Sequence, residues 1–276
     1  MPYQFQPGHM YRMPTHFGPT MGPRQGPDGR KFECKDNPKV TTLAVSFLTN
    51  QEQLAALLPE RFELSGEPVV TVYASYMTEI EWLAGRGYNV LGVAFPATFR
   101  GEQATVTGSF LTVLWENLTD PIISGREELG FAKVYCELPE PTVLRGAWHL
   151  IASWLGFKFL DLEINQLRQQ SAEEIAALAE TSMGQLHYKY MPRTGEWGVP
   201  DVAYACLSPT GHSNRVVKER WVGDGVVRFH PARWEDMPTQ YNIVNTFHAL
   251  EIKAYRGASV TKSVGGEDLS AQQILR

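Results

Sequence analysis

The sequence predicts a mainly β (α+β) protein with a few short helices, arranged as an antiparallel barrel or sandwich. After residue 35, roughly a dozen short segments rich in β-branched and aromatic residues follow one another, separated by turn residues. These segments do not alternate regularly with helices, as a doubly wound parallel sheet requires. The composition does not change after residue 35, which favours one domain over residues 31–276 behind a Pro/Gly-rich arm of residues 1–30.

Local patterns place the individual elements. Asn50 is a suitable N-cap for a helix of sequence QEQLAALL, which Pro59 ends. Ser171 and Glu174 form a capping box that opens a second helix extending to Met183. Between them, Arg100–Gln103 predicts a turn joining two strands. The expected strands are 40–48, 69–76, 88–99, 104–115, 131–138, 148–159, 186–191, 202–207, 216–221, 226–229 and 248–255.

Composition excludes several classes of function. The chain has 276 residues, of which 43% are hydrophobic and 20% charged, so it is too apolar to be disordered. Its net charge of −5 argues against nucleic acid as a partner, and it has no apolar run long enough to cross a membrane. The first twenty residues lack the apolar core of a secretory signal, and the three cysteines are widely spaced. We therefore expect a cytoplasmic protein without disulfides.

One lysine stands out as a candidate for catalysis. The familiar nucleophile, phosphate-loop and zinc motifs are missing from the sequence, and the seven histidines show no metal-ligand spacing. Gly125–Glu128 is predicted to form a loop, and Lys133 lies in the strand predicted to follow it, between Ala132 and Val134. By frequency alone, such a lysine faces solvent. In apolar surroundings, however, the charged form of an amine is disfavoured, and a neutral amine attacks ketones to form a Schiff base.

The segment leading to this lysine resembles a family signature. Gly125-Arg-Glu-Glu-Leu-Gly-Phe-Ala-Lys133 is similar to the GRE…aromatic-Pro-Lys-Lys signature of the acetoacetate decarboxylase family. The resemblance covers roughly residues 35–258. It includes Leu58-Pro-Glu60, the segment from Tyr88 to Gly101, the Glu-x-Trp-x-Gly pattern at 219–223, and the passage from Pro238 to Leu250. It implies an antiparallel, cone-like β-barrel that encloses the lysine, and chemistry that needs no metal or organic cofactor.

Carried over by motif, the resemblance makes Lys133 the Schiff-base lysine. Val134 stands where the family has a second lysine, Val40 where it has an arginine, Val90 where it has a glutamate, and Tyr73 where it has an acidic residue. These substitutions indicate a divergent member. Because Val134 supplies no charge, we expect burial alone to activate Lys133, and its replacement by Met to leave the fold equally or more stable.

The resemblance therefore predicts a Schiff-base lyase that decarboxylates or cleaves a β-keto acid or larger ketone and is poorly suited to acetoacetate. The alternatives are an aldolase-dehydratase or hydratase acting on a 2-keto acid through the same lysine, and a non-catalytic barrel that binds a small molecule. We expect a homo-oligomer, with the N-terminal arm packed across a neighbouring subunit. The candidate catalytic residues are Lys133, Glu128 and Glu127, and the candidate substrate contacts are Tyr73, Tyr88, Val90, Glu116, Arg126, Val134 and His248.

Overall fold

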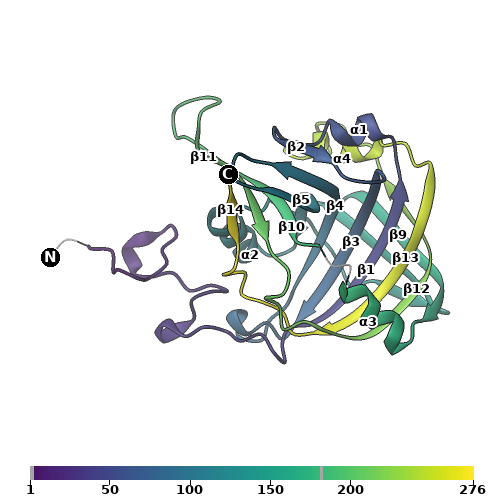
Figure 1. The fold of residues 1–276 in the computed structure, drawn as a ribbon, viewed down its shortest axis with the longest axis horizontal. Helices are drawn as coiled ribbons and strands as arrows, with labels where there is room; N and C mark the ends of the chain where they lie inside the picture. Colours follow the sequence, from purple (N-terminus) through teal and green to yellow (C-terminus); the bar gives the residue numbers. More distant parts are fainter. Residues whose placement is uncertain (1–2, 181–182) are drawn as a thin grey trace.

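The computed structural model describes residues 3–180 and 183–276 and contains one large sheet (Figure 1). Each strand carries the β-branched and aromatic residues typical of half-buried strands. The strands are β1 Lys39–Leu48, β2 Phe62–Leu64, β3 Val69–Thr78, β4 Tyr88–Arg100, β5 Thr105–Glu116, β6 Lys133–Tyr135, β7 Thr142–Leu144, β8 Ala147–Trp154, β9 Phe157–Gln169, β10 Gln185–Pro192, β11 Pro200–Ser208, β12 Val216–Phe229, β13 Ala254–Val264 and β14 Gln273–Leu275. The helices are α1 Gln51–Ala55, α2 Thr119–Ser124, α3 Ala172–Glu180 and α4 Tyr241–His248, with short 3-10 turns at Thr15–Phe17, Pro27–Gly29 and Glu81–Leu83.

The sheet is strongly curved and confirms the predicted mainly β fold. Its strand order is β14-β11-β10-β5-β4-β3-β1-β13-β12-β9-β8-β7, with β2 paired to β4 and β6 paired to β5. Most neighbours are antiparallel, but β10 and β6 both run parallel to β5. Among the described residues the two edge strands, β14 and β7, do not pair with each other, so the sheet is curled without being closed.

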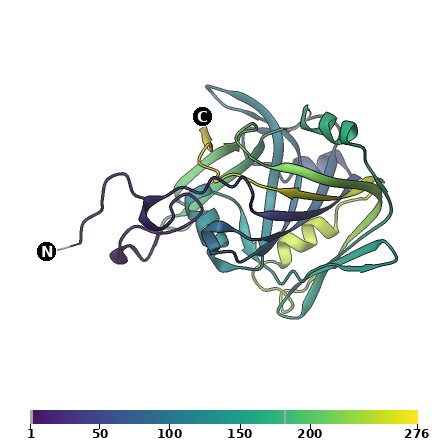
Figure 2. The same ribbon diagram turned by 90° about the horizontal axis from the view of Figure 1, so that it is seen from below.

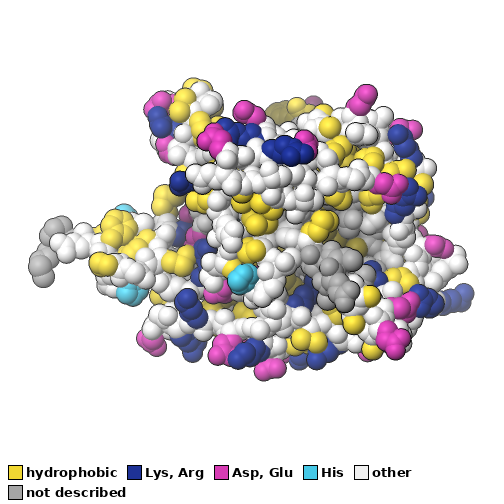
Figure 3. All heavy atoms as spheres, in the orientation of Figure 1, with side chains coloured by type: hydrophobic (Ala, Val, Ile, Leu, Met, Phe, Trp, Pro, Cys, Tyr) yellow, Lys and Arg dark blue, Asp and Glu magenta, His cyan; other side chains and the backbone are white. Residues whose placement is uncertain are grey.

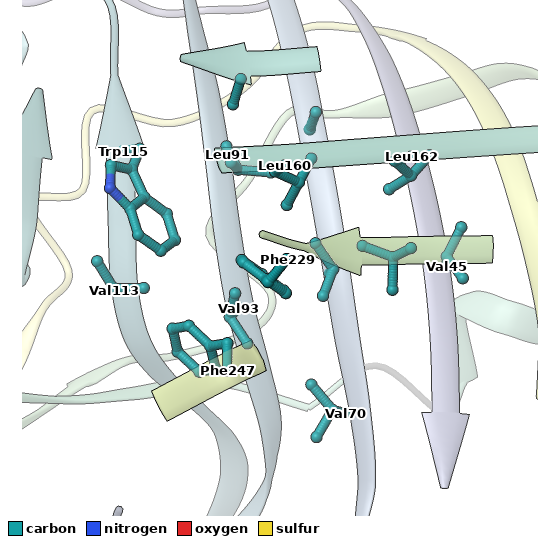
Figure 4. Packing of buried hydrophobic residues seen from close by; sticks show 14 of the residues in the cluster. Val45, Val70, Leu91, Val93, Val113, Trp115, Leu160, Leu162, Phe229 and Phe247 are labelled. Carbon is teal, nitrogen blue, oxygen red and sulfur yellow. The ribbon is translucent and has the colours of Figure 1, made fainter. Parts of the chain in front are cut away.

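One face of the curved sheet encloses the main hydrophobic core (Figure 4). Trp115 is fully buried in this core, and its ring centroid lies 5.3 Å from that of Phe159 and 6.2 Å from that of Phe247. The indole N–H of Trp115 donates a hydrogen bond to Gln240 at 2.7 Å. Helices α1 and α4 cover this core at the upper end in Figure 1, where Leu54 and Phe247 are buried. Burying so much aromatic surface supplies a large part of the folding free energy.

Both predicted caps are confirmed. The side chain of Asn50 accepts hydrogen bonds from the backbone N–H groups of Glu52 and Gln53 at 2.8 and 3.2 Å. Ser171 and Glu174 cap each other's backbone N–H groups at the start of α3. The helix extends to Glu180, and the predicted continuation through residues 181–182 lies outside the described residues.

Three strand predictions need correction. Segment 148–159 is a hairpin, because a turn at Leu155–Gly156 separates β8 from β9. Segments 216–221 and 226–229 belong to one strand, β12. The strand continues through the glycines between the two segments, with irregularities in its pairing to the neighbouring strands. Segment 248–255 is not a strand, since His248 ends α4 and β13 begins at Ala254. The apolar residues of α4 have helical spacing, so one face of the helix packs against the core. This burial favours a helix over the predicted strand.

The segment before Lys133 was predicted to be a loop, but it is helical. Helix α2 continues directly into a π-helical turn, Gly125–Leu129, which ends at Gly130 in the left-handed conformation, with φ of 78°. Pro121 is tolerated because it lies in the first turn, where backbone N–H groups have no helical acceptor. The compact turn brings the chain back alongside the end of β5.

The N-terminal segment, drawn in purple, extends away from the body of the protein before it returns to β1 (Figures 1 and 2). Part of this arm packs on the body through two arginines described below. All three cysteines are free thiols. No described helix has both the length and the apolar character needed to span a membrane.

Candidate active site

The strand register places a second, smaller cluster on the face of the sheet opposite the main core. Val90 of β4 pairs with Glu116 at the end of β5, and Leu114 pairs with Lys133 on the parallel strand β6. Because side chains alternate along a strand, Glu116 and Leu114 point away from the neighbouring core residue Trp115. The buried apolar members of this cluster are Val90, Ala94, Leu111, Leu114, Leu129 and Phe131, with Tyr73, Met77, Tyr88 and Leu269 packed against them.

Lys133 is buried beside this cluster, only 6% exposed. Its Nζ donates a hydrogen bond to the carbonyl of Pro121 at 3.0 Å and lies 5.6 Å from the ring centroid of Phe131. The Oε1 atom of Glu116 lies 2.8 Å from the same nitrogen. Burial of an amine with so few polar partners is rare in proteins unless a carboxylate accompanies it.

Glu116 is fully buried and has an unusual environment. Apart from the ion pair with Lys133, neither carboxylate oxygen has a hydrogen-bond partner among the described residues. Burial raises the pKa of Glu116, while the charge and contact of Lys133 act in the opposite direction. Because its pKa is raised, a carboxyl in this position takes up a proton more readily than an exposed glutamate does, and it lies within hydrogen-bonding distance of the amine.

The glycine of the GRE signature makes room for the lysine. A Cβ atom at Gly125 would lie 2.4–2.6 Å from the Cε, Cδ and Nζ atoms of Lys133, which is closer than non-bonded atoms can approach. Arg126 follows, and its Nη1 donates a hydrogen bond to the backbone carbonyl of Lys133 at 2.8 Å. The arginine therefore fixes strand β6 relative to the π-helical turn.

The two glutamates of the signature contact other parts of the chain, Glu128 through its carboxylate and Glu127 through its backbone carbonyl. The carboxylate of Glu128 forms ion pairs with Arg12 and Arg24 of the N-terminal arm. Lys189 of β10 donates a hydrogen bond to the backbone carbonyl of Glu127 at 2.6 Å and packs against Gly130. Two elements distant in sequence thus hold this turn from outside.

Two tyrosines border the cluster around Lys133. The ring of Tyr73 covers Gly92, where a Cβ atom would lie 2.4 Å from its Cζ. Burial is the main cause that raises the pKa of Tyr73 to about 12; a hydrogen bond with Gln185 acts against it, and the charge of Glu116 adds to it. Burial and the same carboxylate also raise the pKa of Tyr88. Both phenols therefore stay protonated near neutral pH and act as hydrogen-bond donors.

The remaining sequence candidates lie elsewhere. Val134 faces the main core, as expected for the residue that follows Lys133 on a strand. His248 lies at the end of α4, where its Nδ1 is 2.8 Å from the carbonyl of Phe229. Sequence reasoning missed His187, which is buried and stacks on Phe131 at 4.3 Å; burial lowers its pKa to about 4. His187 lies far along the chain from the lysine motif, so no sequence pattern connects it with Lys133.

A cavity of about 320 Å³ leads to this cluster. Tyr88, Val90, Met77 and Leu269 line the cavity and belong to the cluster as well. The cavity extends from there along the same face of β3 and β1 toward the start of β12. A ligand in this cavity would lie with one end close to Val90, which pairs with Glu116 on the neighbouring strand.

The fold and site define a curved, mainly β protein in which a helical turn encloses a buried lysine–carboxylate pair. The model of the acetoacetate decarboxylase (ADC) family matches residues 12–263, and the chain belongs to this family. Its members are lyase-type enzymes, and the predicted family is thereby confirmed. A search of curated proteins finds no match to this chain.

Solved structures share the fold at low sequence identity. Acetoacetate decarboxylase from Legionella pneumophila is 20% identical, with a TM-score of 0.64 over 91% of this chain and 92% of its own. An acetoacetate decarboxylase-like enzyme from Sphingomonas wittichii RW1 is 18% identical, with a TM-score of 0.61 over 87% and 92%. The enduracididine biosynthesis enzyme MppR, solved with pyruvate, is 14% identical, with a TM-score of 0.61 over 91% and 95%.

Proposed function

We propose that this protein is a Schiff-base-forming lyase that decarboxylates or cleaves a β-keto acid or a larger ketone through Lys133. The observation that carries the proposal is the contact of 2.8 Å between the buried amine and the buried carboxylate of Glu116. In a low-dielectric site, transfer of the ammonium proton to Glu116 produces a neutral amine and a neutral acid. The amine is then a nucleophile, and the acid beside it is a proton donor.

The reaction follows from these two groups. The lone pair of Nζ attacks the ketone carbon, the carbonyl oxygen takes the proton of Glu116, and loss of water leaves an iminium ion. The bond from the neighbouring carbon to the leaving carboxylate breaks, carbon dioxide departs, and its electron pair moves into the iminium to give an enamine. Protonation of the enamine carbon and addition of water release the product ketone and restore the amine.

Tyr73 and Tyr88 are suited to bind the substrate rather than to carry the proton. Both phenols remain protonated because their pKa values are raised, so each can donate a hydrogen bond to a developing oxyanion. Glu127 and Glu128, proposed from the sequence as catalytic groups, are better explained as parts of the supporting turn. We assign the acid–base role to Glu116 instead.

Reductive trapping tests the proposal. Incubation with acetoacetate or pyruvate and cyanoborohydride, followed by intact-mass analysis and peptide mapping, should show one adduct at Lys133. Its mass should be that of the substrate minus one oxygen, because imine formation loses water and reduction adds two hydrogens; acetoacetate that has lost carbon dioxide should leave the smaller isopropyl group. Lys133→Arg should show no adduct because a guanidinium does not deprotonate. Glu116→Gln should retain the lysine but form the adduct at least about a hundredfold more slowly, the lower end of the usual range for loss of a general acid or base.

The outcomes separate the alternatives. Trapping of pyruvate without loss of carbon dioxide from any β-keto acid would favour aldolase-dehydratase or hydratase chemistry at the same lysine. If no ketone labels the wild-type protein, or if Lys133→Arg is labelled equally, the lyase proposal is wrong and a non-catalytic binding protein is the better account.

We further propose that the protein is a homo-oligomer in which the arm packs on a neighbouring subunit. The arm carries exposed apolar side chains, including Met13 at 73% and Phe17 at 85% exposure. Figure 3 shows hydrophobic side chains, in yellow, on the surface of the projecting arm. Light scattering should give a mass of at least twice the 31.0 kDa chain. A monomer at micromolar concentration would contradict this.

A further inference from the structure

The cavity that reaches the lysine cluster contains one arginine at its other end. Arg215 immediately precedes β12 and is the only basic side chain among the described residues that line the cavity. No carboxylate of the described part of the chain lies within 4.0 Å of its guanidinium, whereas half of the arginines of this protein form such an ion pair. An arginine that lines a cavity without an internal partner is suited to bind an anionic ligand.

The position of Arg215 is fixed by a serine. Its Nε donates a hydrogen bond to Oγ of Ser263 at 2.9 Å, and Ser263 is 2% exposed. Ser263 lies in register with Val40 of β1 on one side and with Val217 of β12 on the other. The guanidinium is therefore held near Val40, on the same face of the sheet as the lysine cluster, and its remaining N–H groups form no hydrogen bond with the described residues.

The distance along the sheet determines which part of a substrate could reach this arginine. Val90, next to the lysine cluster, and Ser263, below the arginine, lie on strands three spacings apart, in the order β4-β3-β1-β13. At about 4.8 Å per spacing this is roughly 14 Å along a flat sheet, and less across a curved one. A carboxylate bonded to the carbon beside the reacting ketone cannot extend so far.

We propose that Arg215 binds a second carboxylate of the substrate, remote from the ketone that reacts with Lys133. This inference rests on the proposed Schiff-base function and specifies its substrate class: a keto acid with a non-reacting carboxylate several bonds from the carbonyl. Met77 and Trp82 also line the cavity and offer apolar contacts to the intervening chain, and the two carboxylates of the lining, Glu81 and Glu267, form no ion pair with Arg215. The remote carboxylate undergoes no chemical change and serves only to position the ketone.

Matched ligands test this proposal. The probes are 7-oxooctanoate, its neutral methyl ester and the short keto acid 4-oxopentanoate, each trapped on the protein with cyanoborohydride. We expect the wild-type protein to reach half-maximal labelling of Lys133 at an at least tenfold lower concentration of 7-oxooctanoate than of the ester, as a charge-assisted hydrogen bond would give. The short acid should show no such advantage over a neutral ketone.

The variants separate the two claims. Arg215→Gln should abolish the preference for the acid and leave labelling by the ester unchanged, and Ser263→Ala should weaken the preference. Arg228→Gln changes another exposed arginine, which lies within β12 and outside the cavity, so it is the matched control and should behave as wild type. Thermal unfolding of each variant verifies that it is folded.

Two results would overturn the inference while leaving the proposed function intact: equal labelling of the wild-type protein by acid and ester, or a preference that persists in Arg215→Gln. If none of the three ketones labels the wild-type protein, the proposed function itself fails, and the inference fails with it.

Discussion

Replacing Lys133 by Met tests the energetics of the buried pair separately from catalysis. The substitution keeps most of the side-chain volume but leaves the Glu116 carboxylate, which is fully buried, without its only partner among the described residues. Breaking a buried ion pair from one side typically costs about 3–5 kcal/mol. Lys133→Met should therefore lower the free energy of unfolding by about this amount at neutral pH. The double variant Lys133→Met/Glu116→Leu removes both charges and should be as stable as wild type, or more stable by about 1–4 kcal/mol.

The pH dependence of the single variant follows from the pKa of Glu116. Burial raises this pKa above its ordinary value of 4.5, and loss of the ammonium removes the influence that lowers it. Below pH 4.5 the carboxyl is neutral in both the folded and the unfolded chain, so the penalty is absent. Above that pH the unfolded chain ionises first, and stability falls by up to about 1.4 kcal/mol per pH unit until the folded-state pKa is reached.

Urea unfolding, followed by tryptophan fluorescence between about pH 5 and 8, measures both effects. Lys39→Met is the matched control, because the ion pair of Lys39 with Glu79 is exposed and should contribute less than about 1 kcal/mol. The reasoning is refuted if Lys133→Met is as stable as wild type at neutral pH, or if its destabilisation does not diminish on acidification.

Three other predictions concern the surroundings of the pair. Gly125→Ala places a methyl group within 2.4–2.6 Å of the lysine side chain and should displace the amine, so that ketone trapping is lost while the strands stay folded by circular dichroism. Glu128→Gln weakens the ion pairs that hold the arm and should accelerate limited proteolysis within residues 1–30, whereas Glu102→Gln, at an exposed ion pair, should not. Turnover of acetoacetate should be far below the typical enzyme rate of about 10 per second, and turnover at that rate would show that the apolar replacements at Val90 and Val134 did not redirect the site.

The sequence was sufficient to predict those elements whose residues show a regular local pattern. Strands β1 and β3 alternate between the two faces of the sheet, and the caps of α1 and α3 depend on residues only two or three positions apart. Helix α2 and its π-helical turn were missed because Pro121 and Gly125 favour a loop in isolation. The contact of Gly125 with the lysine side chain explains why this position of the helical turn needs a glycine.

The partner of Lys133 could not be derived from the sequence, although Glu116 was among the candidate contacts. The two residues meet because β6 returns parallel to β5, and that pairing depends on the helical turn the sequence did not reveal. The expectation that Lys133 is buried without a compensating charge is therefore wrong. The predicted gain in stability on replacement by Met is reversed, and the substitution should now destabilise the protein.

The same geometry explains what the signature residues do in this chain. An acidic pair so close to a reactive lysine suggests proton transfer, yet the carboxylate of Glu128 faces the arm, and Lys189 holds the backbone behind it. The group placed to exchange a proton with the amine comes from the end of the preceding strand, at Glu116. The signature residues define the shape of the turn that buries Lys133, while the chemistry of the site depends on the residue that the returning strand brings beside it.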